Sequence, residues 1–310
     1  MPLFVLTGAT ATGKTVLGIE LALRHGGEII SADSMQVYRH MDIGTAKPPL
    51  EERRGVPHHL IDILDPDQPF SVAEFQRLVL EAARAIVGRG RLPMMVGGTA
   101  LYIRAVVNEY CFPDAPGDER IRAELGEVAN NLGARALHNM LSEVDPVSAA
   151  RIHENDRRRL IRALEVYRLT GVPLSEFARR RGEGLLDTLV VALDVPRPEL
   201  YRRIDARVDR MIAAGLPSEV RRLHEMGYGE RLFSMQSLGY REMIDFLFGR
   251  STLEEAVRLL KRNTRRFAKR QLTWFRNDPR ITWVNVGNNR PKDSVLEEVT
   301  RLIEGKLLPA

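Results

Sequence analysis

The sequence predicts an α/β fold in which a parallel sheet core is interrupted by an inserted all-helical domain. Short apolar runs alternate with longer amphipathic segments, as strands alternate with crossover helices. A glycine loop at residues 8–15 joins the first strand to the first helix. Residues 113–185 change to helical, arginine-rich sequence, after which a strand pattern returns. We therefore expect a core of residues 1–112 and 186–310 with a helical insert between them.

The first strand (residues 3–6) and the first helix (residues 16–25) enclose a motif with the spacing G-x-x-x-x-G-K-[ST]. In this context the glycines let backbone N–H groups surround a di- or triphosphate, and the helix dipole adds to the attraction. Lys14 adds a positive charge, and the Thr15 hydroxyl is a candidate ligand of Mg²⁺. The core is therefore expected to be P-loop NTPase-like. The candidate diphosphate- or nucleotide-binding residues are Gly8, Ala9, Thr10, Ala11, Thr12, Gly13, Lys14 and Thr15.

Polar residues follow the next two predicted strands of the core. Asp33 comes directly after residues 28–32, and Thr99 comes after residues 92–96 and two glycines. Sites in α/β proteins form where the carboxyl ends of parallel strands meet, so Asp33 is the first candidate for chemistry. P-loop NTPases usually place a magnesium-holding aspartate where this chain has Gly-Gly-Thr, which argues against ordinary ATP hydrolysis.

The remaining pattern completes the core. Residues 57–62 resemble an edge element, and its paired histidines lack further ligands at metal spacing, which favours a structural role. A capping box, Ser71-x-x-Glu74, begins a crossover helix that ends near Gly88. After the insert we expect a strand at 185–195, helices at 198–214, 217–226 and 240–248, a long helix from the capping box Ser251-x-x-Glu254 to about Arg276 with Leu253 inward, a strand at 281–286 and a helix at 293–304.

Arginine and lysine gather in two places. Residues 253–280 contain nine basic residues against three acidic ones, with Trp274 and Phe275 nearby for packing or stacking. In the insert, residues 156–165 place Leu160, Ile161 and Leu164 on an inner helix face and arginines on the outer face. Both patterns are typical of a surface that contacts nucleic-acid phosphates, although a solvated charged face is the alternative for the insert.

Composition excludes several other classes of protein. The chain has 310 residues, a net charge of +5 and one cysteine, which leaves no disulfide framework and no cysteine-based metal site. It has no apolar run of membrane-spanning length and no basic leader at its start. We expect a cytoplasmic protein that does not bind membranes, and a monomer, since no spare apolar stripe suggests a dimer.

Six stretches in the same order along the chain resemble the tRNA dimethylallyltransferase family of bacterial type. The family moves a dimethylallyl group from dimethylallyl diphosphate to N6 of adenosine 37, next to the anticodon, in tRNAs that read codons starting with U. The resemblance implies Mg²⁺ as cofactor and dimethylallyl diphosphate and the anticodon stem-loop as partners. The six stretches are residues 8–15, 33–38, 97–102, 157–165, 237–242 and 269–274.

The resemblance also implies roles for individual residues. Asp33 is the base that accepts a proton from the weakly nucleophilic adenine amine. Thr99 lies beside the reacting centre, and a helix N-cap is the structural alternative for it. The P-loop holds the departing diphosphate, so no phosphoryl transfer is required. The implied tRNA-contacting residues are Asp33, Ser34, Met35, Gln36, Thr99, Arg122, Arg157, Arg158, Arg159, Leu160, Ile161, Lys269, Arg270 and Gln271.

Three other functions use the same motifs. An adenylate isopentenyltransferase would prenylate free AMP, ADP or ATP and would have little use for the basic insert. A P-loop small-molecule kinase would consume ATP, with Asp33 deprotonating a hydroxyl. A non-catalytic RNA-binding P-loop protein would tolerate Asp33→Ala. Salt-sensitive binding to tRNA, ATP turnover and the Asp33→Ala variant separate these alternatives.

Overall fold

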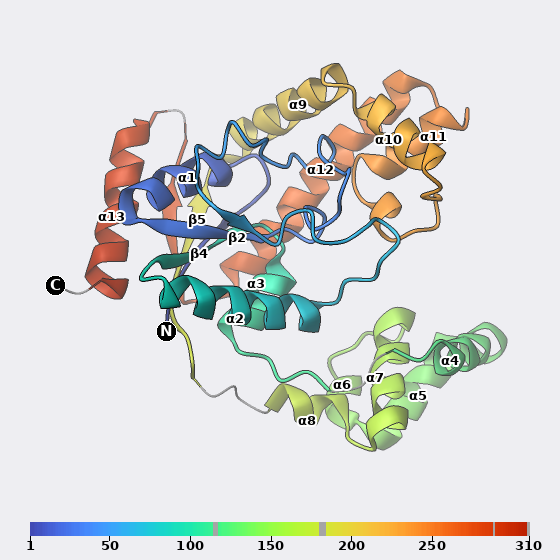
Figure 1. The fold of residues 1–310 in the computed structure, drawn as a ribbon. Helices are drawn as coiled ribbons and strands as arrows, with labels where there is room; N and C mark the ends of the chain where they lie inside the picture. Colours follow the sequence, from blue (N-terminus) through green and yellow to red (C-terminus); the bar gives the residue numbers. More distant parts are fainter. Residues whose placement is uncertain (114–116, 180–183, 288, 309–310) are drawn as a thin grey trace. The chain divides into compact units, whose positions relative to one another are not determined.

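The computed structural model describes residues 1–113, 117–179, 184–287 and 289–308 (Figure 1). The chain divides into two compact units, a core unit of Met1–Val107 with Leu185–Ala310 and an inserted unit of Asn108–Gly184. The insert thus begins at residue 108, where the sequence pattern suggested 113. Among the helices of the described ranges, none combines the length and apolarity needed to cross a membrane.

A six-stranded sheet in the order β3-β2-β4-β1-β5-β6 forms the centre of the core unit, and every neighbouring pair is parallel. Because all strands run the same way, their carboxyl ends lie along one edge, where Ala32 pairs with Gly97 and Gly8 with Leu193. The strands are β1 (Pro2–Gly8), β2 (Gly27–Ala32), β3 (His58–His59), β4 (Leu92–Gly97), β5 (Asp187–Asp194) and β6 (Ile281–Asn285).

Helices cover both faces of the sheet because successive strand residues point to opposite sides (Figure 1). Phe4 and Leu6 pack with α1 (Lys14–His25) and α13 (Lys292–Leu307) on one face. Leu3 and Val5 pack with α2 (Val72–Gly88) and α3 (Ala100–Val107) on the other. The predicted parallel sheet is therefore confirmed, and helices cover both of its faces.

A second helical group of the core unit packs around the residues that follow β2. It consists of α9 (Arg197–Ala213), α10 (Leu216–Glu225), α11 (Tyr240–Leu247) and α12 (Leu253–Arg276). Val37, Tyr38 and Met41 are buried against these helices in one apolar cluster. This packing holds the segment after Asp33 between the sheet edge and α9–α12.

The inserted unit has its own apolar core. Leu125, Leu141 and Leu160 are buried in one cluster, to which Ala149 also belongs. Asp145 is buried there and accepts hydrogen bonds from Ser148 N and Ser175 N, both at 2.9 Å. The helices are α4 (Glu119–Leu132), α5 (Ala134–Val144), α6 (Pro146–Ala149), α7 (Arg157–Thr170) and α8 (Leu174–Arg179).

One predicted helix start is wrong by a residue. Ser71 caps α2 as predicted and accepts from Glu74 N at 3.1 Å, whereas α12 is capped by Thr252, which accepts from Glu255 N at 3.2 Å. Thr252 stands three residues before Glu255, so it can cap the helix as Ser251 was expected to do. Leu253, the first residue of α12, is 37% exposed rather than inward.

The paired histidines have the structural role predicted for them. His58 and His59 form the short edge strand β3. The His59 ring bonds the buried Glu28 carboxylate at 2.7 Å, and His58 bonds Val56 O at 2.8 Å. One nitrogen of each ring is therefore hydrogen-bonded to a neighbouring group of the core unit.

Candidate active site

The glycine loop between β1 and α1 adopts a shape that depends on two glycines. Gly8 and Gly13 have φ angles of +135° and +93°, which favour glycine. A Cβ at Gly8 would lie 2.7 Å from Leu193 O, so β5 also requires a residue without a side chain there. Thr12 is buried, and its hydroxyl donates to Ala9 O at 2.9 Å, which stabilises the loop from inside.

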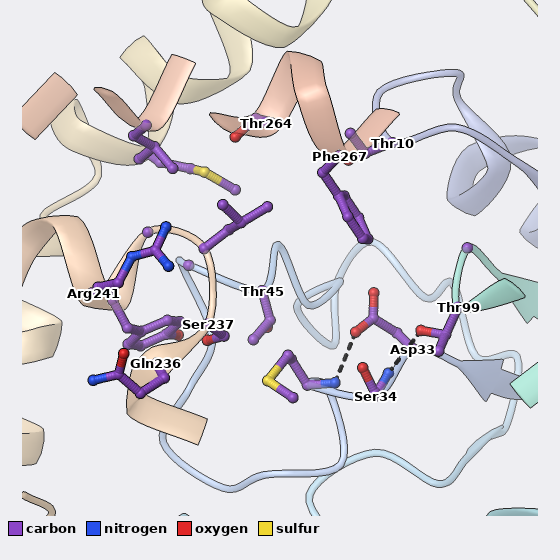
Figure 2. A pocket seen from close by; sticks show the side chains of 18 of the residues that line it. Thr10, Asp33, Ser34, Thr45, Thr99, Gln236, Ser237, Arg241, Thr264 and Phe267 are labelled. Atoms are coloured by element: carbon purple, nitrogen blue, oxygen red, sulfur yellow. Dashed lines mark hydrogen bonds between the residues drawn. The ribbon is translucent and has the colours of Figure 1, made fainter. Parts of the chain in front are cut away.

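Two cavities of the core unit meet at the carboxyl edge of the sheet. The first, of about 390 Å³, contains Asp33, Ser34 and Thr99, and we call it the carboxylate cavity (Figure 2). The second, of about 960 Å³, contains Lys14 and Thr15, and we call it the cation cavity. Arg207 and Met211 of α9 line both cavities, so the two are neighbours.

Asp33 and Thr99 come together because β2 and β4 are adjacent. Asp33 Oδ1 accepts from Met35 N at 2.9 Å, and Thr99 Oγ1 accepts from Ser34 N at 3.1 Å. The backbone carbonyl of Thr99 accepts from Ile103 N at the start of α3. Its side-chain hydroxyl does not cap the helix in this way, because the hydroxyl oxygen accepts from Ser34 N. The Thr99 proton therefore stays available for donation. Figure 2 shows the Asp33 carboxylate facing the cavity with Thr99 beside it and Phe267 across from it.

Lys14 is a cation whose surroundings favour the neutral form. Its Nζ donates to Ala9 O at 2.6 Å. Burial, followed by the nearby charge of Arg207, lowers the pKa of Lys14 to about 7, although Asp33 acts in the opposite direction. Burial also lowers the pKa of Arg207, again opposed by Asp33. An anion bound between Lys14 and Arg207 would relieve this repulsion.

Sequence reasoning missed the arginines of α9. Arg203, Arg207 and Arg210 all line the cation cavity. Their spacing of four and three residues places them on one helix face, a signal that the sequence contained. Arg203 pairs with Glu199. In the described part of the chain, Lys14, Arg207 and Arg210 form no ion pair, although the charge of Asp33 acts on Lys14 and Arg207.

Two predicted tRNA-contacting glutamines also hold the site together. Gln271 accepts from Thr10 N at 2.9 Å and donates to Gly98 O at 2.8 Å, and it also lines the carboxylate cavity. It thereby links the glycine loop to the end of β4. Gln36 accepts from Ser31 Oγ at 2.9 Å and donates weakly to Thr45 O and Ala46 O, whereas Ser34 and Met35 line the carboxylate cavity.

The basic surface of α12 is partly neutralised. Lys269 and Arg270 are exposed, and Arg270 also lines the carboxylate cavity. Phe275 is buried, whereas Trp274 is half-exposed with the Arg104 guanidinium 5.1 Å from its ring centroid. Five of the nine basic residues form ion pairs, which are Arg258–Glu255, Lys261–Asp209, Arg265–Asp205, Arg276–Asp194 and Arg280–Asp278.

The inserted unit contains a basic cavity of about 580 Å³ organised around a buried carboxylate. Glu165 is fully buried and accepts from Arg122 Nε at 2.8 Å, Arg162 Nη1 at 2.7 Å and Asp118 N at 2.8 Å. Burial raises the pKa of Glu165, but the hydrogen bonds from Arg162 and Asp118 N together with the arginine charges lower it by a larger amount. The pKa of Glu165 is therefore lowered from its ordinary value. The ionised carboxylate therefore fixes two arginines in place.

The other predicted residues of the insert differ in accessibility. Arg157 and Arg158 line the same cavity as Ile161, and Arg157 donates to Asn130 Oδ1 at 2.7 Å. Arg159 is exposed and pairs with Asp156 at 3.4 Å. Leu160 is fully buried in the core of the insert, so its predicted RNA contact is wrong for the side chain. Arg162, which the sequence reasoning left out, joins this basic cavity.

Comparison with known families gives two matches. The model of the IPP transferase family matches residues 36–278, and that of the isopentenyl transferases matches residues 1–63. Two curated tRNA dimethylallyltransferases are similar over most of the chain. That of Desulforudis audaxviator is 57% identical and covers 92% of each chain. That of Geobacillus thermodenitrificans is 52% identical and covers 98% of this chain and 96% of its own.

Solved structures agree with these relatives. A full-length tRNA isopentenylpyrophosphate transferase from Bacillus halodurans is 48% identical, with a TM-score of 0.75, over 99% of this chain and 96% of its own. A eukaryotic dimethylallyltransferase acting on tRNA is 29% identical, with a TM-score of 0.83, over 99% of this chain and 79% of its own. The same fold therefore extends over nearly the whole chain.

Proposed function

The chain belongs to the IPP transferase family, and we propose that it transfers a dimethylallyl group from dimethylallyl diphosphate to N6 of adenosine 37 in tRNAs that read codons starting with U. The products are N6-(dimethylallyl)adenosine and diphosphate. The observation that carries the proposal is that the cavity containing Asp33 adjoins the cavity containing Lys14, Arg207 and Arg210. The reaction needs both, one at the nucleophile and one at the leaving group.

Asp33 is the proposed general base. The exocyclic amine of adenine is a weak nucleophile because its lone pair is delocalised into the ring. A carboxylate that accepts the departing proton compensates for this weakness. Asp33 Oδ1 is oriented by Met35 N, and the Thr99 hydroxyl beside it is able to donate to the acceptor nucleotide or the diphosphate.

The cation cavity is the proposed diphosphate site. As the allylic C–O bond breaks, negative charge grows on the leaving oxygen, and fixed positive groups stabilise it most when they are already in place. The glycine-loop N–H groups, Lys14 and Arg207 supply this charge, and Arg210 adds to the cavity wall. Arg207 also lines the carboxylate cavity, so we place the allylic carbon of the donor beside Arg207, between the diphosphate and the adenine amine.

Mg²⁺ is the proposed cofactor, and the residues present fit it. Within the described ranges no group of three or more His, Cys, Asp or Glu side chains forms a metal site. Mg²⁺ commonly takes one or two protein ligands together with phosphate oxygens and waters. Thr15 lines the cation cavity at the start of α1 and would be such a ligand. When bound, the ion would neutralise charge on the diphosphate.

The acceptor is proposed to be the anticodon stem-loop. A stacked base must leave its neighbours to reach Asp33, so the loop has to be gripped while the base is extruded. Ser34, Met35, Lys269 and Arg270 are the proposed contacts of the core unit. Those of the inserted unit are Arg122, Arg157, Arg158, Arg159, Ile161 and Arg162. We further propose a cytoplasmic monomer.

Mass spectrometry of the RNA product tests this function. Protein, Mg²⁺, dimethylallyl diphosphate and an unmodified anticodon stem-loop with adenosine at position 37 are incubated together. We expect the RNA to gain one dimethylallyl group at that adenosine. Parallel reactions also contain AMP or ATP. Prenylation of the free AMP with unchanged RNA would favour the adenylate isopentenyltransferase, and ATP consumption would favour the kinase.

A further inference from the structure

Residues 42–47 form an irregular segment that borders both cavities of the proposed active site. Gly44 and Thr45 line the carboxylate cavity, whereas Ala46 and Lys47 line the cation cavity. The segment has no regular secondary structure to hold it in place. Since the prenyl group passes from the diphosphate to the adenosine, this segment is one wall along its path.

A single carboxylate holds the backbone of this wall. Glu219 of α10 is 4% exposed, and its Oε2 accepts from Asp42 N at 3.0 Å and Ile43 N at 2.8 Å. Its Oε1 accepts from Gly44 N at 3.1 Å and from the Tyr240 hydroxyl at 2.7 Å. Three of these four hydrogen bonds come from backbone N–H groups of the segment, and they add to its internal turn bonds from Ala46 N to Ile43 O and from Lys47 N to Asp42 O.

The packing around Glu219 is specific to the residues present. Tyr240 is fully buried, and burial together with the Glu219 charge raises its pKa well above the ordinary value, so the phenol remains a donor. A Cβ at Gly44 would lie 2.3 Å from Tyr240 Cε2, so only glycine allows this close approach. At the other end of the segment, the buried Lys47 ammonium donates to Tyr38 O at 2.9 Å and to Asp42 Oδ1 at 2.6 Å.

We propose that Glu219 is a positioning residue for prenyl transfer, which holds residues 42–47 as a wall that keeps water away from the allylic carbon. The inference rests on the proposed function. An allylic carbon that is losing its diphosphate reacts with any nucleophile beside it, so water must be excluded. In the competing reaction the bond from carbon to the diphosphate oxygen breaks, a bond from carbon to water oxygen forms, and the water proton passes to solvent. Its products are dimethylallyl alcohol and diphosphate.

The test compares two products in one reaction, the diphosphate released and the prenylated RNA formed. In Glu219→Gln an amide N–H faces the backbone N–H groups, and we expect the hydrolysed fraction of the donor to rise by about tenfold. Tyr240→Phe keeps the carboxylate and removes one donor, so a smaller rise in the same direction is expected. Glu28→Gln is the matched control, since Glu28 is a buried carboxylate that bonds His59 and Arg89 and lines neither cavity.

The outcomes are distinct. A Glu219→Gln protein that loses thermal stability as Glu28→Gln does, yet keeps the wild-type ratio of the two products, would show that Glu219 is only structural. If Glu219→Gln does not fold, an unchanged ratio in Tyr240→Phe overturns the inference. A wild-type protein that prenylates no RNA would instead overturn the proposed function itself.

Discussion

The carboxylate cavity and the cation cavity are neighbours that share Arg207 and differ in their other charged groups. Asp33 lines the first together with hydroxyl and apolar side chains and Arg270, whereas Lys14 and Arg210 line only the second. A transfer reaction needs both a base for the incoming amine and positive charge for the leaving group. Because Asp33 lines only the carboxylate cavity and Lys14 only the cation cavity, loss of Asp33 should mainly affect the rate of transfer, and loss of the cations should mainly affect donor binding.

The largest expected effect is that of Asp33→Ala. Loss of a general base lowers kcat by about 10²- to 10⁴-fold, while KM for dimethylallyl diphosphate stays near the wild-type value. Steady-state prenyl transfer to the stem-loop measures both constants. A decrease in kcat of less than about tenfold would mean that another group accepts the amine proton. The proposed division of roles between the two cavities would then be wrong.

Arg207→Ala should weaken donor binding. Removing one charge-assisted contact to a diphosphate oxygen should raise KM for dimethylallyl diphosphate by about 10- to 100-fold. Arg202→Ala is the matched control, since Arg202 lies on the same helix, is exposed and lines neither cavity. Equal effects of the two variants would show that α9 contributes only general positive charge.

Arg162→Ala tests whether the inserted unit binds tRNA and takes no part in donor binding. We expect KM for the stem-loop to rise by about tenfold and the salt dependence of binding to weaken by about one phosphate contact. KM for the donor should not change. Arg168→Ala is a suitable control, because this arginine of the same helix pairs with Glu124 and lies outside the basic cavity. A changed donor KM would contradict the assignment of Arg162 to the tRNA.

The smallest expected effect concerns the protonation of Lys14. Because burial and Arg207 lower its pKa to about 7, a bound anion should raise that pKa and draw a proton onto Lys14. Diphosphate affinity should then be greatest below about pH 7 and decrease as pH rises through that value. Calorimetry in two buffers of different ionisation enthalpy measures the proton uptake. Lys14→Met should abolish this part of the uptake.

Much of the site follows from local sequence, since a strand, a glycine loop and a helix specify phosphate binding by themselves. The parallel order of strands also brought Asp33 and Thr99 to one edge, as expected. Arg207 and Glu219 were not found because their roles depend on how α9 and α10 pack, which local patterns do not encode. The backbone contacts of Gln271 and Gln36 were not found for the same reason, since they form only when segments distant in sequence meet.

Charge density along the sequence was also only a partial guide. Asp205 and Asp209, which pair with Arg265 and Lys261 of α12, come from α9, so counting charges within residues 253–280 overestimates the free positive charge. In the insert, periodicity correctly placed Leu160 inward, and this burial excludes its side chain from the RNA surface. The family resemblance implied tRNA contacts for all of residues 157–161, whereas the structure separates the buried Leu160 from the exposed arginines beside it.

The most direct test of the division between the cavities is the equilibrium binding of Mg²⁺-diphosphate to the wild-type, Asp33→Ala and Arg207→Ala proteins, measured by calorimetry. The account predicts that Asp33→Ala binds diphosphate as tightly as wild type or more tightly, because a negative charge near Lys14 and Arg207 has been removed. Arg207→Ala should bind more weakly. Weaker binding by Asp33→Ala would contradict the account, since it would place the carboxylate within the diphosphate site.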